Sequence, residues 1–351
     1  MGHPKIQQLG TLKDIFQTNS KIFPFSMDTF VFYSIIVTML LTAILVVSVS
    51  GIYHIESAEA QLTNSSSVSE LIEKGNSLFD LGNHEEAITW YDKALKINPQ
   101  NVSTLLNKGK SLLALGRYEE AIGWFDKALE IDPRFVKALG NRGVALDYLG
   151  KYEEAISWYD KVLEIDSKNG KALSNIGVAL SKLGRKEEAI SWYDKALEID
   201  SKDVYSLTHK GSALSNLSKV GEAITWYDKA LEVDPRFIGA LYNKGLALDK
   251  IGKHDEAIIW YDKALEIDPK FVSALYAKAL SLVKLGKYEE SIKWLDKSLE
   301  VDPNDVDAWV AKGLSLVHVG KVLGALESWD KVLTIDPSNK RALELKSSFQ
   351  N

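Results

Sequence analysis

A 34-residue period runs through most of this 351-residue chain and constrains its fold more than any other feature. The phrase EAITWYDKAL occurs at 86–95 and again, letter for letter, at 222–231. Repetition on this scale predicts a solenoid of stacked units, because one unit cannot bury its own apolar face. Glycines recur at the same interval, with Ala279 in the one gap: Gly75, Gly109, Gly143, Gly177, Gly211, Gly245 and Gly313.

Each unit has the pattern of two helices. The first helix carries apolar or small residues at i, i+4 and i+7, and the second repeats this spacing, as in Ala155, Tyr159 and Val162. A glycine, or Ser218 in unit five, separates the two and suits the left-handed residue that ends a helix. We expect an all-α chain with eight units at 68–101, 102–135, 136–169, 170–203, 204–237, 238–271, 272–305 and 306–339, then a capping helix at 340–351.

The recurring Trp-aromatic-Asp-Lys phrase is predicted to be structural. Neighbouring Asp and Lys side chains point about 100° apart on a helix, so they do not form paired catalytic groups. We expect these aspartates to be solvated and the tryptophans to flank the buried stripe. A second row of cations precedes each repeat glycine, from Lys74 and Lys108 to Lys312, with Ile176 in unit four. We expect it to pair with acidic residues of neighbouring helices.

At this period, the order of residues resembles the tetratricopeptide repeat family. Unit two shows it in full: Leu105, Gly109, Leu112, Ala121, Phe125, Ala128 and Pro133. The resemblance covers 68–339 and is closest to prokaryotic membrane proteins of this family. It implies a right-handed α-solenoid whose concave face, formed by the first helices, binds peptides or partner proteins. Unit seven departs most, with Ala279, Ser291, Leu295 and Ser298 at the usual Gly, Ala, aromatic and Ala positions.

Function is expected where the copies differ. The family geometry places the second, fifth, ninth, twelfth and thirteenth residues of each first helix on the concave face. Units six to eight are apolar there, which is typical of an interaction surface. Units three and four are polar. The predicted partner-binding residues are Tyr242, Leu246, Tyr276, Leu280, Val310 and Leu314, with Lys137, Asn141, Lys171 and Asn175 as the polar group. Asn76, Asn107, Lys137 and Asn141 match only part of the family's carboxylate clamp.

The N-terminal region has three segments. Residues 29–53 contain no charged side chain and are long enough for a transmembrane helix, here a signal anchor. Residues 1–28 carry lysines and are predicted to be a short cytoplasmic tail, which places the repeats on the extracytoplasmic side of the membrane. Residues 54–67 are a Ser-rich tether containing Asn64, a glycosylation candidate. Cleavage near Ala60, which would release a secreted protein, is the alternative.

Composition excludes several functions. A net charge of −6 disfavours nucleic-acid binding, and the lack of cysteine excludes disulfides and thiolate chemistry. The six histidines have no metal-ligand spacing, and no nucleotide-binding or hydrolase motif occurs. We expect no enzyme activity and no cofactor. The sequence predicts a membrane-anchored scaffold for protein–protein interaction. A structural spacer or self-associating module, or a noncatalytic subunit of an envelope enzyme complex, remain alternatives.

Overall fold

The computed structural model describes residues 68–350. The chain divides into two compact units, Met1–Glu73 and Lys74–Asn351. Within the first unit, the structure describes only residues 68–73, which begin the first helix. The predicted cytoplasmic tail, transmembrane helix and most of the tether, with Asn64 and Ala60, lie outside the described residues.

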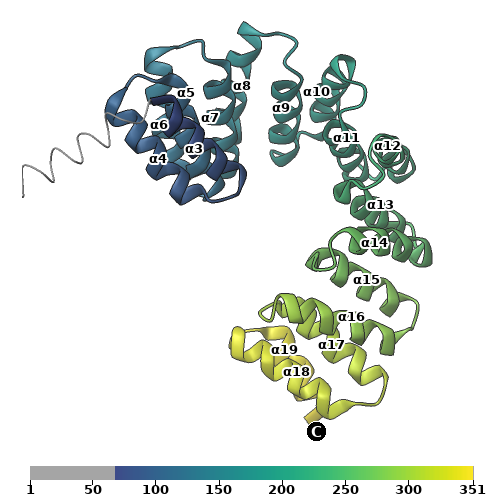
Figure 1. Ribbon diagram of the computed structural model, residues 1–351. Coiled ribbons are helices and arrows are strands. Elements are labelled where there is room, and N and C mark those ends of the chain that lie inside the picture. The colour runs from purple at the N-terminus through teal and green to yellow at the C-terminus, as the bar shows by residue number, and fades with distance from the viewer. Residues whose placement is uncertain (1–67, 351) are drawn as a thin grey trace, which may run out of the picture. The chain divides into compact units, whose positions relative to one another are not determined.

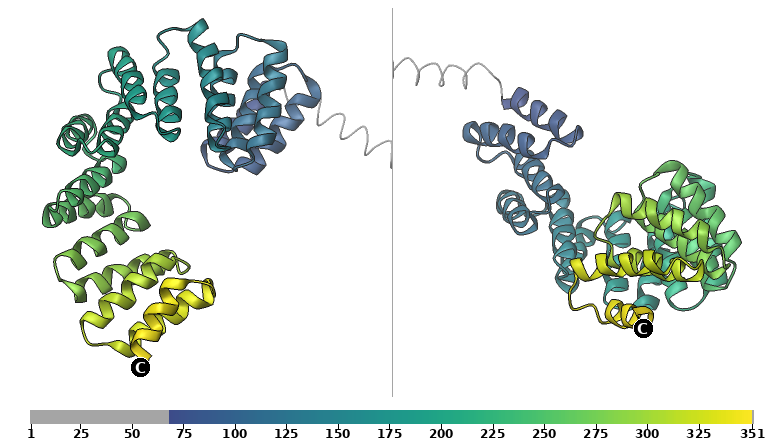
Figure 2. Two further views of the ribbon diagram at one scale, coloured as in Figure 1. Left: turned by 180° about the vertical axis from the view of Figure 1, so that it is seen from behind. Right: turned by 90° about the horizontal axis from the view of Figure 1, so that it is seen from below.

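Lys74–Asn351 is built from helix pairs that follow one another in sequence order (Figures 1 and 2). The described residues form helices α3 to α19 and no strand. The first helices are α3 (Val68–Asp80), α5 (Val102–Ala114), α7 (Val136–Tyr148), α9 (Gly170–Lys182), α11 (Val204–Asn216), α13 (Ile238–Lys250), α15 (Val272–Lys284) and α17 (Val306–His318). The second helices are α4 (His84–Ile97), α6 (Tyr118–Ile131), α8 (Tyr152–Ile165), α10 (Lys186–Ile199), α12 (Val220–Val233), α14 (His254–Ile267), α16 (Tyr288–Val301) and α18 (Val322–Ile335). The last helix is α19 (Lys340–Gln350).

The turn between the two helices of a unit requires a left-handed residue. The expectation for the turn glycines is confirmed, since all seven have φ between 74° and 81°. Ser218 fills the same place in unit five with φ 62°. An aspartate or asparagine follows each second helix. In all eight units its side chain accepts a backbone N–H two residues on, as Asp132 accepts from Arg134 at 3.0 Å.

Close contact between the helices of a unit explains the repeat glycines. A Cβ added to Gly245 would lie far inside van der Waals contact with the ring of Tyr261, and the same holds in the other glycine-bearing units. Unit seven exchanges both partners at once. It has Ala279 for the glycine and Leu295 for the ring, and both are fully buried. The methyl group of Ala279 occupies the space that an aromatic ring at the position of Leu295 would fill.

Adjacent units are joined by a repeated cation bridge, which we call the junction ladder. Its cation precedes the repeat glycine, or Ala279 in unit seven, and pairs with the Asp of the preceding unit's second helix. It also lies over a Trp of its own unit, which is on the second helix except for Lys312, where it is Trp309 of α17. At one junction, Arg142 lies 2.6 Å from Asp126 and 3.9 Å from the ring centre of Trp158. The predicted pairing is confirmed for Lys108–Asp92, Arg142–Asp126, Lys210–Asp194, Lys244–Asp228, Lys278–Asp262 and Lys312–Asp296. Lys346 of α19 continues the series with Asp330.

The ladder corrects the expectation that the aspartates of the repeated phrase are simply solvated. Their side chains are about half exposed, as with Asp228 at 45%, while the paired Lys244 is 11% exposed. The ladder is interrupted once. Ile176 is buried at the cation position of unit four, so Asp160 has no ion pair within the described residues. Burial, with a smaller contribution from Glu164, raises the pKa of Asp160.

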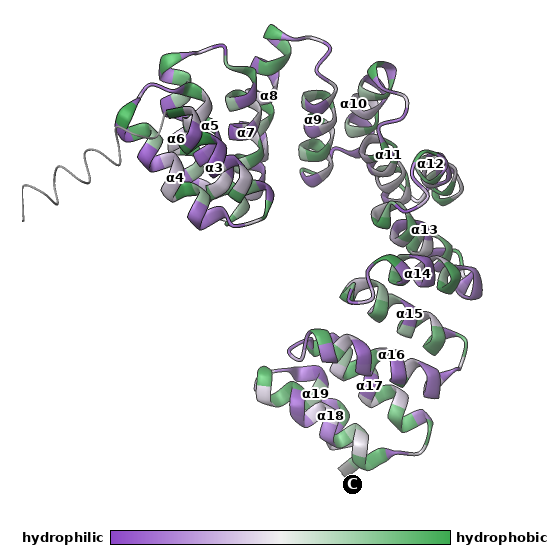
Figure 3. Cartoon of the chain, viewed as in Figure 1, coloured by the Kyte–Doolittle hydropathy of each residue, from purple (hydrophilic) through white to green (hydrophobic). Residues whose placement is uncertain are grey.

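Within the described residues, every helix is either too short or too polar to cross a membrane. Polar and apolar residues alternate along each of them (Figure 3). This pattern fits helices that bury one face only.

Candidate partner-binding surface

The first helices form one continuous surface, which we call the first-helix face. From α5 to α17, each first helix lies beside the next one, so side chains that point away from the second helices share one face. On α13 this face presents Tyr242 and Leu246, and on α15 it presents Tyr276 and Leu280. Leu246 is 40% exposed, and the other three are partly buried. The sequence-predicted apolar residues of units six and seven therefore come together.

Aromatic neighbours hold the Tyr242 side chain in place. The ring of Tyr242 lies 5.2 Å from the ring of Phe271 and 6.0 Å from that of Tyr261, between centroids. Burial raises the pKa of the Tyr276 hydroxyl, and nearby Asp307 and Asp305 add to this. The hydroxyl therefore remains a hydrogen-bond donor at neutral pH.

The prediction for unit eight is corrected at Val310. This residue is only 3% exposed, and it packs in a core cluster with Trp329 and Ala342. Leu314 is partly buried against the same cluster. Val310 loses access to a partner because α19 supplies Ala342 and Leu345 to this core. Leu314 stays partly exposed, as Tyr242, Tyr276 and Leu280 do. The apolar surface, as the name is used below, consists of Tyr242, Leu246, Tyr276 and Leu280 on the adjacent helices α13 and α15.

The polar residues of units three and four lie on neighbouring helices α7 and α9. Lys137 and Lys171 are exposed, and neither forms an ion pair with another described residue. The side-chain amide of Asn141 donates to the carbonyl of Lys137 at 2.7 Å, so it is already engaged within α7. Asn175 is half-buried and hydrogen-bonds Tyr159. The two lysines are free to meet an anionic partner, whereas the side-chain amides of the two asparagines already hydrogen-bond within the protein.

Most of the buried repeat tyrosines donate a hydrogen bond from the hydroxyl to a residue of the first helix in the same unit. In unit six, Asp249 accepts from the Tyr261 hydroxyl at 2.7 Å and from the Ser281 hydroxyl at 2.7 Å. Nδ1 of His254 lies 2.8 Å from the other oxygen of Asp249. Both carboxylate oxygens are therefore satisfied, as a half-buried charge requires.

Unit three carries the same arrangement without two of these donors. The Tyr159 hydroxyl donates to Oδ2 of Asp147. At the positions of His254 and Ser281, the chain has Tyr152 and Ala179. Oδ1 of Asp147 is buried and has no donor among the described residues. Burial raises the pKa of Asp147 to about 6, against the opposing effect of the Tyr159 hydrogen bond. The pKa of Tyr159 is raised as well, by burial and then by Asp147.

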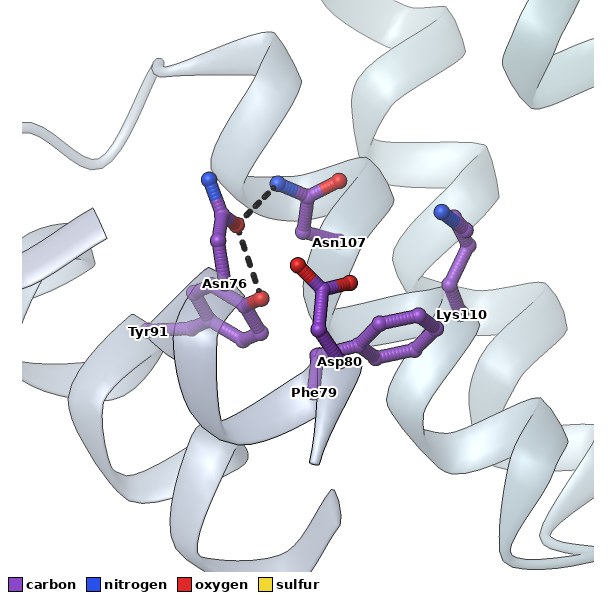
Figure 4. A pocket seen from close by; sticks show the side chains of 6 residues that line it. All are labelled: Asn76, Phe79, Asp80, Tyr91, Asn107 and Lys110. Atoms are coloured by element: carbon purple, nitrogen blue, oxygen red, sulfur yellow. Dashed lines mark hydrogen bonds between the residues drawn. The ribbon is translucent and has the colours of Figure 1, made fainter. Parts of the chain in front are cut away.

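A polar pocket of about 270 Å³ lies at units one and two (Figure 4). Oδ1 of Asn76 accepts from the Tyr91 hydroxyl at 2.9 Å and from Nδ2 of Asn107 at 2.9 Å. Asp80 and Lys110 face the same space, and Phe79 closes it. Lys137 and Asn141 are not among its lining residues. The four residues of the partial clamp are thus divided between this pocket and α7.

Comparison with known proteins decides the family. A TPR repeat family matches residues 75–116, 211–252 and 279–320, and a tetratricopeptide repeat family matches 100–168 and 135–202. Two further tetratricopeptide repeat families match 239–271 and 260–293. Together these matches cover 75–202 and 211–320, which is more than half of the chain. The chain belongs to the tetratricopeptide repeat family.

Two solved structures with TM-scores above 0.5 agree on the fold. The Cut9–Hcn1 hetero-tetramer of the APC/C aligns over 80% of this chain and 55% of that chain, with 19% identity and a TM-score of 0.60. PilF of Pseudomonas aeruginosa aligns over 61% of this chain and 97% of that chain, with 20% identity and a TM-score of 0.54. YrrB, described as a TPR protein with an unusual peptide-binding site, aligns over 54% and 97%, with 25% identity and a TM-score of 0.45. No curated protein sequence matches the chain.

Membership of the TPR family identifies the repeats as a scaffold suited to protein–protein interaction, a role that is generally noncatalytic. The residues between 68 and 350 also contain no group of three or more acidic or histidine side chains placed to hold a metal ion.

Two TPR surface residues, Asp147 and Asp249, were missed by sequence reasoning that compared the fifth and ninth residues of each first helix. The twelfth residues vary as strongly: Phe79, Leu113, Asp147, Ser181, Ser215, Asp249, Val283 and Val317. The sequence did contain a signal for these two residues, since only two of the eight copies have an aspartate at this otherwise uncharged position.

Proposed function

We propose that this TPR protein is anchored in a membrane through residues 29–53, holds its repeats on the extracytoplasmic side and binds a protein partner on its first-helix face. The anchor concentrates partner encounters at the membrane. The family's right-handed superhelix makes this face concave, so an extended segment of the partner can lie along it.

The observation that carries the proposal is the apolar surface of Tyr242, Leu246, Tyr276 and Leu280. The core of units six and seven is already complete without Leu246, since Leu241, Ala264, Leu265, Ala274 and Leu275 are buried there. A scaffold alone does not require an exposed leucine on the same helix face as Tyr242. Buried aromatic anchors dominate binding free energy in protein interfaces, which favours these tyrosines as the centre of the contact.

Affinity capture tests the proposal. The full chain, purified in detergent, is immobilised and exposed separately to an envelope extract and to cytosol. A Leu246→Asp variant places a charge on the apolar surface without removing any buried group. Leu323→Asp is the matched control, because Leu323 is 78% exposed on α18, a second helix.

An envelope protein retained by the parent chain and by Leu323→Asp, but weakened at least tenfold by Leu246→Asp, is the expected result. Tyr242→Ala with Tyr276→Ala should weaken the same partner, with helix content checked by circular dichroism. Capture from cytosol alone reverses the proposed topology. A partner indifferent to Leu246→Asp excludes the apolar surface, and recovery of the chain alone favours the spacer or self-associating module.

A further inference from the structure

The turn of unit five differs from every other turn in the repeat array. Seven units place glycine at the left-handed position, and unit five places Ser218 there with φ 62°. Ser218 is the one non-glycine residue with positive φ among residues 68–350. A side chain in this conformation costs about 1 kcal/mol relative to glycine. The sequence of unit five therefore keeps a serine at a position where glycine fits better.

Nothing within the array offsets this cost. The Ser218 side chain is exposed, and the structure shows no hydrogen bond from its hydroxyl to another residue of the described part. Its backbone N–H donates to the carbonyl of Ser215 at 3.1 Å, a bond that the turn glycines make equally, as in Gly252 to Asp249 at 2.9 Å. The hydroxyl thus contributes nothing to the fold that is visible here.

The hydroxyl does complete a recognisable acceptor sequence. Asn216-Leu217-Ser218 has the Asn-X-Ser form that directs attachment of a glycan to asparagine. The thirteenth and fifteenth residues of a unit form such a pair in unit five alone. Asn216 is exposed as the last residue of α11, and Leu217 turns partly inward between the two polar side chains. Gly221 follows on α12 where other units have an acidic residue or Leu323, and open space surrounds its position.

A second acceptor sequence provides an internal comparison. Asn101-Val102-Ser103 also lies in the described residues, but Asn101 is the N-cap of α5. Its Oδ1 accepts from the backbone N–H of Thr104 and from the Thr104 hydroxyl, both at 2.9 Å. Ser103 belongs to the first turn of the same helix. A transferase acting on the folded chain would have to unwind that turn, whereas at Asn216 both side chains project from a helix end.

We infer that Asn216 is a site of N-linked glycosylation. Nδ2 of Asn216 would lose a proton and bond to the anomeric carbon of a diphosphate-activated sugar, and the diphosphate carrier would leave. Ser218 is retained in a strained conformation because its hydroxyl is required for recognition of the acceptor. This inference rests on the proposed extracytoplasmic location of the repeats.

Mass spectrometry of the full chain, purified from membranes of the cells that naturally make it, tests the inference. Peptide mapping should find a sugar mass on Asn216 and none on Asn101. Asn216→Gln and Ser218→Ala should remove that mass, and Ser218→Thr should retain it. Ser218→Gly should remove it while raising the unfolding temperature of the unmodified protein, since glycine relieves the left-handed strain.

A protease added to spheroplasts, in which the outer face of the anchoring membrane is accessible, separates the two ways in which the test can fail. If the repeats are cleaved from outside and Asn216 carries no sugar, the inference is overturned and the proposed location stands. If the repeats are protected and Asn216 is unmodified, the location fails and the inference fails with it. A sugar on Asn101 in place of Asn216 also overturns the inference, because the capped asparagine was then the better acceptor.

Discussion

Replacing Asp147 by asparagine should stabilise the protein at neutral pH, which is unusual for a side chain that accepts a hydrogen bond. Burial raises the pKa of Asp147 to about 6 in the folded chain, against 3.8 for an exposed aspartate carboxyl group. Because the folded state binds this proton more tightly, the favourable contribution of the protonated carboxyl is complete below pH 3.8. It is lost as pH rises through 6.

The size of the loss follows from the two pKa values. Each unit of difference corresponds to about 1.4 kcal/mol, so the ionised carboxylate costs about 3 kcal/mol at most above pH 6. Partial exposure reduces this to about 1–2 kcal/mol. Asparagine has no charge and keeps an oxygen that can accept from the Tyr159 hydroxyl. The free energy of unfolding of Asp147→Asn should exceed that of the parent chain at pH 8 and nearly equal it at pH 4.

Asp249→Asn is the matched control. Asp249 accepts from Tyr261 and Ser281 and lies 2.8 Å from Nδ1 of His254. Asparagine keeps one oxygen for Tyr261 and Ser281 but turns its amide nitrogen toward Nδ1 of His254, which must then move its proton to Nε2, and the variant should be destabilised by about 1 kcal/mol at neutral pH. The same substitution is therefore expected to raise the free energy of unfolding at Asp147 and to lower it at Asp249, although the two residues occupy equivalent positions.

Urea unfolding followed by circular dichroism at pH 4 and pH 8 measures both variants. Repeat arrays unfold in segments, so hydrogen exchange of α7 and α8 locates the effect. A gain from Asp147→Asn that is equal at the two pH values would show that the charge is not its cause. A loss of stability at pH 8 would show that Oδ1 of Asp147 already has a donor in solution, such as a water molecule.

Two further predictions concern the junctions and the core. Lys244→Ile copies the natural Ile176 and should lower the free energy of unfolding by about 1–3 kcal/mol, since Asp228 loses its cation and Trp260 loses the cation over its ring. The reverse change, Ile176→Lys, should have a smaller effect of either sign, because the lysine gains Asp160 as a partner but replaces a buried apolar side chain. Urea unfolding of the two variants measures this, and a loss of the same size at both sites would contradict a role for the ion pair. Gly245→Ala should cost about 1–3 kcal/mol because its Cβ meets the Tyr261 ring, and adding Tyr261→Leu should recover part of that cost, as in unit seven. A double-mutant cycle that shows no coupling between the two sites would refute this account of Ala279 and Leu295.

The helical array was open to prediction because its signals are local and repeated. The turn glycines and the apolar spacing at i, i+4 and i+7 each act within one or two turns of helix, and the 34-residue period repeats them, so they can be recognised without knowing what packs against them. The pairing of the cation row with neighbouring acidic residues was also predictable, but not its register. Lys108 meets Asp92 in the preceding unit and Trp124 in its own, and only the stacking of units brings these three together.

The candidate surface was less predictable, because exposure depends on what covers a residue rather than on its position in the repeat. Val310 and Tyr276 occupy the same position, yet α19 buries the first and leaves the second half-exposed. Asp147 and Asp249 also share a position, and they differ through two donors, one at the start of the unit's own second helix and one on the following first helix. A position within the repeat therefore fixes the direction of a side chain, while its neighbours on two adjoining helices decide whether it is available to a partner. Because these neighbours vary independently along the array, the first-helix face can differ from unit to unit while the repeated framework stays the same.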